Sequence, residues 1–237
     1  MIKSAAQDIA AFKDIILNAG FLGYKIYADY VSNQSEETNS FYIGDNTAFM
    51  LSGTNLTLCG KPSAEHLEEI LMFCNFCRVT SIESQIEGLP MKVDKVLHIM
   101  EYTGKGGVSH PDIVKNQEIY SFIKFCCNNF HNINFDIVYS NFIRKVNRKV
   151  SDIYFIKENG KIVSGAISTN YGEDSVYITF VATDKEYRGQ GFAAKVIGHI
   201  INDHKSKKII LKCEDSLLPF YQKLGFEKIE IVKLYKE

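Results

Sequence analysis

Two glycines separated by one residue precede a helical pattern in the second half of the chain. The stretch reads "ITFVATDKEYRGQGFAAKVI", in which Arg188 precedes Gly189 and a second glycine, Gly191, follows Gln190. Glycine has no Cβ, so its backbone can adopt unusual dihedral angles and approach a ligand closely. The first turn of a helix carries unpaired N–H groups and a partial positive charge, which together bind anions. The stretch therefore predicts a site for a phosphate or pyrophosphate.

Other phosphate-binding motifs fit this stretch less well. In a P-loop, Lys and Ser or Thr directly follow the last glycine, whereas Gly191 is followed by Phe-Ala-Ala-Lys. A dinucleotide-binding fingerprint is nearly matched by Gly189, Gly191 and Ala194. That fingerprint should follow the first strand of a βαβ unit, with an acidic residue about 20 positions later. Here the glycines lie late in the chain, and "SKKIILKC" occupies the place of the acid. An ordinary turn before a helix remains as the alternative.

The same stretch resembles the acyl-CoA-binding segment of the GNAT superfamily of N-acetyltransferases, whose signature is Gln/Arg-x-x-Gly-x-Gly/Ala. Arg188, Gly191 and Ala193 occupy the fixed positions of that signature. A later stretch, "LLPFYQKLGFEKI", is similar to the family's segment in which a tyrosine precedes Lys-Leu-Gly-Phe. The resemblance covers about residues 112–237, and two motifs in the right order make it more specific than a lone glycine pair.

The resemblance implies acetyl-CoA as the co-substrate and a binding site in two parts. The backbone groups of Val181, Ala182 and Thr183 would bind the pantetheine arm, in a gap where two neighbouring strands separate. The main-chain N–H groups that would bind the pyrophosphate belong to Gly189, Gln190, Gly191, Phe192, Ala193 and Ala194. The side chain of Arg188 would be a secondary contact or would only shape the turn.

The resemblance also implies direct attack of an amine on the thioester carbonyl. This reaction needs a neutral amine, a donor for the developing oxyanion and an acid for the leaving thiolate. Tyr221 matches the family's tyrosine acid, with an aromatic side chain packed under its helix as the alternative. The base is open, because Ser175 stands about where many members have a glutamate. Glu173 in the adjacent loop and Glu214, where many members have an asparagine, are the candidates, and each has a solvated surface charge as its alternative.

The pattern of apolar residues predicts the elements that must position these residues. An apolar stripe over residues 191–204 predicts a helix docked on a sheet, and Asn159-Gly160 between two apolar runs predicts a β-hairpin. The other expected elements of this half are helices at 116–130, 135–150 and 217–225 and strands at 176–183, 208–213 and 226–235. The order favours an α/β (α+β) fold, and the resemblance implies a GNAT-like mixed, mostly antiparallel sheet flanked by helices and preceded by a smaller α+β domain.

The stretch "TGKGGVSHPD" marks the clearest break in the chain, because glycines and a proline follow a strand-like run. It predicts a linker at residues 105–111 between an N-terminal α+β domain (1–104) and the GNAT-like acetyltransferase domain (112–237). The N-terminal domain, which begins with a helix expected at residues 4–18, resembles a degenerate acetyltransferase half without the signature loop. It would either form a wall of the acceptor site or complete the core.

Composition excludes several functional classes. The 237 residues are 46% hydrophobic and 23% charged, with a net charge of -1 and a pI near 6.6, which gives no support for a nucleic-acid or membrane partner. Neither a secretory signal nor an apolar run of about 18 residues is present, so we expect a cytoplasmic protein. Cys74 and Cys77 form a C-x-x-C with no second pair, which favours buried core residues over a metal or redox site. No metal is expected.

The sequence thus predicts an acetyl-CoA-dependent N-acetyltransferase acting on a primary amine of a small molecule or a protein. The alternative is a non-catalytic acyl-CoA-binding or regulatory module. Ser175, in place of a glutamate, favours the binding module, whereas Tyr221 favours the enzyme. The acceptor and the oligomeric state stay open, a homodimer included.

Overall fold

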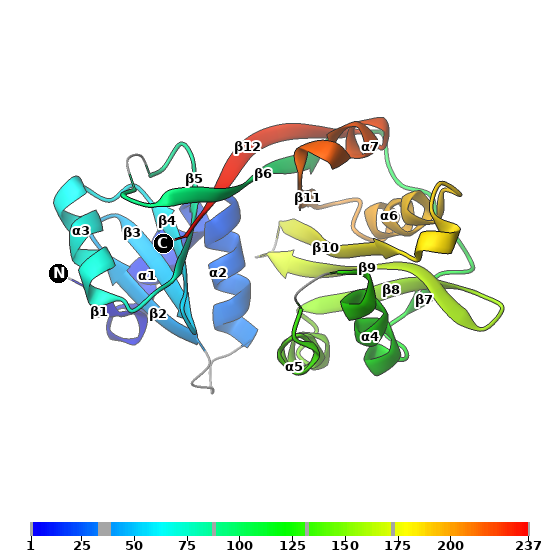
Figure 1. Ribbon diagram of the computed structural model, residues 1–237, viewed down its shortest axis with the longest axis horizontal. Coiled ribbons are helices and arrows are strands. Elements are labelled where there is room, and N and C mark those ends of the chain that lie inside the picture. Colours follow the sequence, from blue (N-terminus) through cyan, green and yellow to red (C-terminus); the bar gives the residue numbers. More distant parts are fainter. Residues whose placement is uncertain (1, 33–38, 87–88, 131–132, 172–173, 237) are drawn as a thin grey trace. The chain divides into compact units, whose positions relative to one another are not determined.

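The computed structural model describes residues 2–32, 39–86, 89–130, 133–171 and 174–236 (Figure 1). Contacts along the chain divide it into two compact units. Unit 1 comprises Met1–Met100, Cys213–Leu218 and Lys228–Glu237, and unit 2 comprises Glu101–Lys212 and Pro219–Glu227. The C-terminal strand therefore groups with the N-terminal part of the chain, although it follows unit 2 in sequence.

Unit 1 is an α+β unit. Its helices are α1 (Ile9–Asn18), α2 (Phe21–Ser32), α3 (Ala64–Phe73) and the 3-10 turns η1 (Ala5–Gln7) and η3 (Asp215–Leu217). Its strands are β1 (Lys3–Ser4), β2 (Asn39–Gly44), β3 (Thr47–Ser52), β4 (Asn55–Gly60), β5 (Arg78–Ile82) and most of β6 (Lys92–Tyr102) and β12 (Phe226–Lys236). Strands β1 to β4 pair antiparallel in order, β5 is parallel to β4, and β12 is antiparallel to β5.

Local capping decides where the first helix begins. The helix predicted at residues 4–18 is in fact a short strand, a 3-10 turn and then α1, which starts at Ile9. Asp8 causes this, because its Oδ1 accepts a hydrogen bond from the backbone N–H of Ala11 at 3.1 Å. A side chain that satisfies a free N–H in the first turn is the usual N-cap arrangement. The predicted start of the helix at residue 4 was therefore wrong, because Asp8 caps the helix and makes Ile9 its first residue.

Unit 2 contains the sheet on which the predicted site lies. Its strands are β7 (Val114–Lys115), β8 (Ser151–Glu158), β9 (Lys161–Tyr171), β10 (Ser175–Thr183) and, up to Lys212, β11 (Lys208–Cys213). Its helices are α4 (Ile119–Asn129), α5 (Phe135–Asn147), η2 (Lys185–Tyr187), α6 (Phe192–Asp203) and nearly all of α7 (Leu218–Lys223). Strands β7 to β10 pair antiparallel in order, and β11 is parallel to β10.

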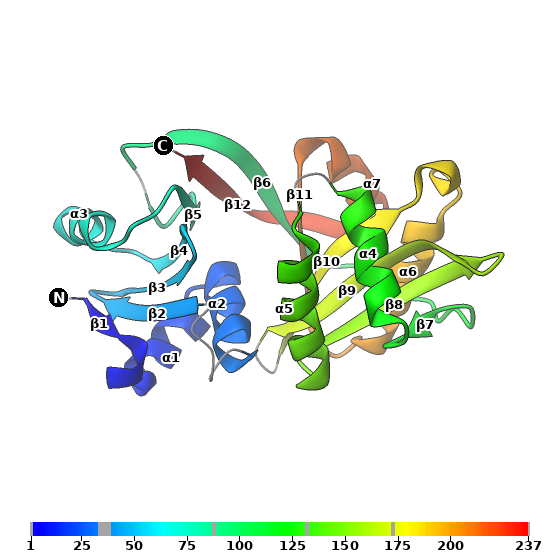
Figure 2. The same ribbon diagram turned by 60° about the horizontal axis from the view of Figure 1, so that its bottom comes forward.

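The sheet of unit 2 is covered on both faces. Helices α4 and α5 lie against one face of β8, β9 and β10, and α6 lies against the other, as Figures 1 and 2 show. The β8–β9 hairpin turns at Asn159 and Gly160, whose φ values of 49° and 78° lie in the left-handed region. This is the tight turn that the Asn-Gly pair predicts. The mixed, mostly antiparallel sheet flanked by helices agrees with the predicted fold class.

The segment expected as a linker lies within unit 2. The backbone N–H of His110 donates to Nδ1 of His199 on α6 at 3.0 Å. A Cβ added at Gly107 would lie 2.1 Å from the carbonyl oxygen of Gly198, so the two backbones are in close contact. The segment thus packs along α6, and the domain boundaries at 1–104, 105–111 and 112–237 stay a prediction.

Candidate functional site

Strands β10 and β11 separate towards their carboxyl ends. Their parallel pairing runs from Ser175 and Lys208 to Ile178 and Leu211, whereas β10 continues to Thr183. On its other edge, β10 stays paired with β9 to its last residue. In the described part of the chain, the β11-facing edge of residues 179–183 therefore has no strand partner. This is the separation that the resemblance implies for the pantetheine site.

A β-bulge in β10 produces this separation. The register with β9 shifts between Thr179 and Ala182, so that Phe180 and Val181 face Ala166 alone. Phe180 has a φ of 51°, a value that residues with a Cβ rarely adopt. A bulge bends its strand and increases the local twist, so the end of β10 turns away from β11.

The two glycines behave as their types predict. Gly189 and Gly191 have φ values of 77° and 80°, and a Cβ added at either would meet no atom within 4 Å. Gly191 is the N-cap of α6, and no side chain caps this end of the helix. The first-turn N–H groups of α6 therefore have no intrahelical partner. We call residues 188–194, which form this helix end and the turn before it, the cradle; residues 188–191 of it are exposed.

Helix α6 is fixed on the sheet by its apolar face. Five residues of the predicted stripe are buried, namely Phe192, Val196, Ile197, Ile200 and Ile201, and the sixth, Ala193, is half-buried. The helix contacts β8, β9 and β10. A helix docked in this way holds its N-terminus still, which favours a preorganised anion site.

Polar contacts hold the other end of α6. The hydroxyl of Tyr154 on β8 donates to Oδ2 of Asp203 at 3.2 Å, and Lys115 forms an ion pair with the same carboxylate at 3.1 Å. His204 places Nε2 at 3.4 Å from the hydroxyl oxygens of Tyr154 and Ser168. Burial lowers the pKa of His204 and raises that of Tyr154. Both groups are therefore favoured in their neutral forms.

The Arg188 side chain turns back towards β10. Its Nε donates to the carbonyl oxygen of Thr183 at 3.1 Å, and the side chain is exposed. Gln190 Nε2 donates to the carbonyl oxygen of Glu186 at 3.3 Å. Of the two roles expected for Arg188, these contacts support shaping the turn.

The predicted catalytic residues lie in different parts of the chain. Tyr221 on α7 is 5% exposed, and its ring packs against those of Phe220 and Phe226 at centroid distances of 5.0 and 5.9 Å. Glu214 belongs to unit 1, is about half exposed and forms an ion pair with Lys95. Glu173 lies outside the described residues. The catalytic roles of all three stay predictions.

Ser175, which stands about where many family members have a glutamate, has a structural contact. Its side chain is buried, and its hydroxyl donates to the carbonyl oxygen of Tyr171 at 2.5 Å. This hydroxyl links the first residue of β10 to the last residue of β9. It is not placed to act as a base.

One histidine–carboxylate pair was missed by the sequence reasoning. His98 on β6 is 5% exposed and lies 2.5 Å, through Nε2, from Oδ1 of Asp215, both in unit 1. Among the described residues, its buried Nδ1 has no hydrogen-bond partner. The two residues are 117 positions apart, so only the placement of a histidine in an apolar strand pattern could have suggested the pair.

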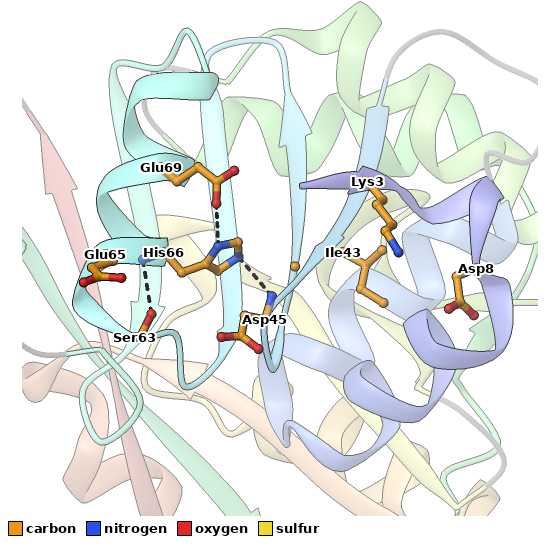
Figure 3. Close-up of a pocket in the computed structure, with 9 residues that line it drawn as sticks. Lys3, Asp8, Ile43, Asp45, Ser63, Glu65, His66 and Glu69 are labelled. Carbon is orange, nitrogen blue, oxygen red and sulfur yellow. Dashed lines mark hydrogen bonds and ion pairs between the residues drawn. The ribbon is translucent and has the colours of Figure 1, made fainter. Parts of the chain in front are cut away.

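A pocket in unit 1 was also not anticipated. It has a volume of ≈ 470 Å³ and contains His66, whose Nε2 accepts from the backbone N–H of Asp45 at 3.1 Å and whose Nδ1 lies 2.9 Å from Glu69 (Figure 3). A Cβ added at Gly44 would lie 1.9 Å from Nε2, so a glycine is required there. Both ring nitrogens of His66 are occupied, and the ring ties α3 to the β2–β3 turn.

The cysteine prediction is only half right. Cys74 is buried, and burial raises the pKa of its thiol to about 11. Cys77, expected in the core, is exposed, because it lies in the loop that follows α3. Among the described residues, no three His, Cys, Asp or Glu side chains form a group that could hold a metal ion. No helix within the same residues is long and apolar enough to cross a membrane.

A family model matches part of the sequence, and solved structures match the fold. The model for the acetyltransferase (GNAT) domain matches residues 149–228, which include the bulge, the cradle and Tyr221. No curated protein is significantly similar in sequence.

Solved GNAT acetyltransferases share the fold of the chain beyond this segment. The acetyltransferase from the GNAT family of Colwellia psychrerythraea has a TM-score of 0.65 and 13% identity, with 100% of both chains covered. The GCN5-related N-acetyltransferase from Sphaerobacter thermophilus has a TM-score of 0.63 and 11% identity, covering 100% of this chain and 95% of that one. The enzyme of the same description from Kribbella flavida has a TM-score of 0.60 and 12% identity, covering 90% and 95%. The predicted resemblance and fold class are confirmed.

Proposed function

We propose, from the premise that residues 149–228 form an acetyltransferase (GNAT) domain, that the protein moves an acetyl group from acetyl-CoA to a primary amine. The acceptor would be a small molecule or a protein amino group. Membership in the family supports acyl transfer in general, and the choice of acetyl-CoA and of an amine is our proposal. One observation carries it: a strand that separates from its parallel neighbour is followed, after the η2 turn, by an uncapped helix N-terminus.

The two parts of this arrangement would bind different parts of acetyl-CoA. The N–H groups of residues 189–194 would bind the pyrophosphate, and the α6 dipole would stabilise its negative charge. The backbone of residues 181–183 would pair with the amides of the pantetheine arm, as an added strand pairs with a sheet edge. The thioester would then lie beyond the bulge, where the strands have separated.

The reaction would be a direct transfer. A neutral amine attacks the thioester carbonyl, a C–N bond forms and the C–S bond breaks. The amine proton passes to a base, for which Glu173 and Glu214 are our candidates, and Tyr221 gives a proton to the leaving thiolate. Backbone N–H groups of β10 would stabilise the oxyanion. The reaction calls for no metal, and we place it in the cytoplasm without a nucleic-acid or membrane partner.

The test is a binding and turnover experiment on the full chain. Acetyl-CoA and CoA should each raise the melting temperature, because a ligand that binds the folded state stabilises it, whereas NAD should not. Release of the CoA thiol from acetyl-CoA in the presence of a panel of amines should then exceed the rate without amine. A shift of the melting temperature with NAD alone would contradict the proposal.

A non-catalytic acyl-CoA-binding or regulatory module is the second candidate. The observation in its favour is Ser175, whose hydroxyl is committed to the Tyr171 carbonyl and leaves that place without a base. Tight binding of acetyl-CoA with no thiol release for any class of amine would establish this module. Turnover with one amine would exclude it.

A further inference from the structure

The end of β10 is fastened by a buried serine on the neighbouring strand. Ser164 on β9 is 0% exposed, and its Oγ donates to the carbonyl oxygen of Ala182 at 3.0 Å. The same Oγ lies 2.9 Å from Oγ1 of Thr183. A hydroxyl has one proton to donate, so the Thr183 hydroxyl is the donor in the second contact. One side chain thus fixes two consecutive residues.

Two further hydrogen bonds hold this end of the strand. The Nε of Arg188 donates to the carbonyl oxygen of Thr183 at 3.1 Å, and the N–H of Asp184 donates to the carbonyl oxygen of Val163 at 2.8 Å. The carbonyl groups of Ala182 and Thr183 therefore each carry a hydrogen bond within the protein. In the described part of the chain, no strand pairs with Val181. Of the three residues expected to bind the pantetheine arm, Val181 has the most available backbone.

Ring packing holds Phe180, the residue before Val181 in the bulge. The ring of Phe180 packs against those of Phe142 and Phe130 at centroid distances of 5.3 and 5.5 Å. Its φ of 51° is a sparsely populated conformation, which persists only when the surroundings hold it. Val181 thus lies between two fixed points, the Phe180 ring and the Ser164 hydroxyl. Release of either would let the backbone of Val181 rotate.

We propose that Ser164 is a positioning residue of the acyl-CoA site, whose hydroxyl orients the backbone of Val181 towards the pantetheine arm. The inference rests on the proposed function and deepens it. Ser164 does not touch the ligand and acts through Ala182 and Thr183. Replacing it by alanine removes the side-chain hydrogen bond to the Ala182 carbonyl and the partner of the Thr183 hydroxyl. The strand end would then be held only by its pairing with β9 and by Arg188, and the backbone of Val181 would be less fixed.

The test compares two ligands and two buried serines. Isothermal titration measures the binding of CoA and of adenosine 3′,5′-bisphosphate, which carries no pantetheine arm. Ser164→Ala should weaken CoA binding about tenfold, which corresponds to about 1.4 kcal/mol, and leave the bisphosphate within twofold. The matched control is Ser168→Ala, on the same strand and 2% exposed, whose hydroxyl faces His204. It should change neither affinity.

Other results of this test would overturn either the positioning role of Ser164 or the proposed function. Equal weakening of both ligands would show a general structural defect and overturn the positioning role, as would unchanged CoA binding. If Ser164→Ala does not fold, Thr183→Val removes the second of the two Ser164 contacts, the one with the Thr183 hydroxyl, and should give a smaller difference between the two ligands in the same direction. Should the unaltered protein bind neither ligand, the proposed function fails and the inference with it. Binding by the unaltered protein without a Ser164 effect overturns the inference alone.

Discussion

Gly191 and Gly198 belong to the same helix region but should respond in opposite ways to an added methyl group. Gly191 has a φ of 80°, and a residue with a Cβ pays roughly 1–2 kcal/mol for that conformation. Gly198 lies inside α6, where an added Cβ would approach only the backbone of Val108, at 3.8 Å. Alanine is better than glycine in a helix interior by roughly 0.8–1 kcal/mol. The left-handed backbone conformation at residue 191 requires a glycine, whereas the helical conformation at residue 198 does not.

We therefore expect Gly191→Ala to lower the free energy of unfolding and Gly198→Ala to raise it, each by about 1 kcal/mol. Urea denaturation of both variants and the unaltered protein measures the two changes. Gly191→Ala should also weaken CoA binding, because the cradle amides would turn away. Equal stability of the two variants would contradict the left-handed conformation at residue 191.

Tyr221 supports a second prediction at the scale of single residues. If its hydroxyl protonates the leaving thiolate, Tyr221→Phe should lower kcat by about 10²-fold, in line with the loss of a general acid. The KM for acetyl-CoA should stay within twofold, since the ring still packs against Phe220 and Phe226. Tyr120→Phe, an exposed tyrosine on α4, is the control. An unchanged kcat would make Tyr221 a packing residue.

At the scale of elements, the polar end of α6 predicts a dependence of stability on pH. Burial lowers the pKa of His204 in the folded state, with Tyr154, Ser168, Asp203 and Lys115 around it. The unfolded chain then binds a proton more readily than the folded chain below about pH 6.5. Stability contributed by neutral His204 is present above that pH and is lost as the pH falls through the folded pKa.

The urea midpoint should therefore fall between pH 7 and pH 5, and His204→Gln should reduce that fall. The substitution removes the titrating group while keeping a side chain that can hydrogen bond to Tyr154 or Ser168. Carboxylates such as Asp203, whose pKa is lowered in part by Lys115 although burial opposes this, act only at more acidic pH. The same fall in both proteins would show that His204 does not cause it.

The sequence could predict those elements that depend on residues close together in the chain. The apolar stripe of α6 and the Asn159-Gly160 hairpin depend on residues close in sequence, and both are observed. The bulge in β10 has no such signal, because Phe180 takes a left-handed conformation only where rings from other elements hold it. The left-handed conformation of the cradle glycines was predictable, because glycine is the residue type that favours positive φ. Phenylalanine does not favour positive φ, so its type gave no indication of the bulge.

At the scale of the whole molecule, long-range pairing limited the prediction. His98 and Asp215 are 117 positions apart, and β12 pairs with β5, from Val232 with Ile82 to Lys236 with Arg78. Periodicity identifies a strand but not its partner. A division of the chain by sequence alone therefore could not place its last strand with the first unit.

This pairing decides what a truncation would do. Removing residues 1–104 takes away β5 and leaves β12 with an unpaired edge, on which Val232 and Tyr235 would lose the burial they now have. Exposed strand edges with apolar side chains associate with other chains. We expect fragment 105–237 to elute as aggregates in size-exclusion chromatography, and fragment 105–227, which also lacks most of β12, to aggregate less. A monomeric fragment 105–237 that binds CoA would instead show that unit 2 needs neither β5 nor any other part of unit 1 before residue 101.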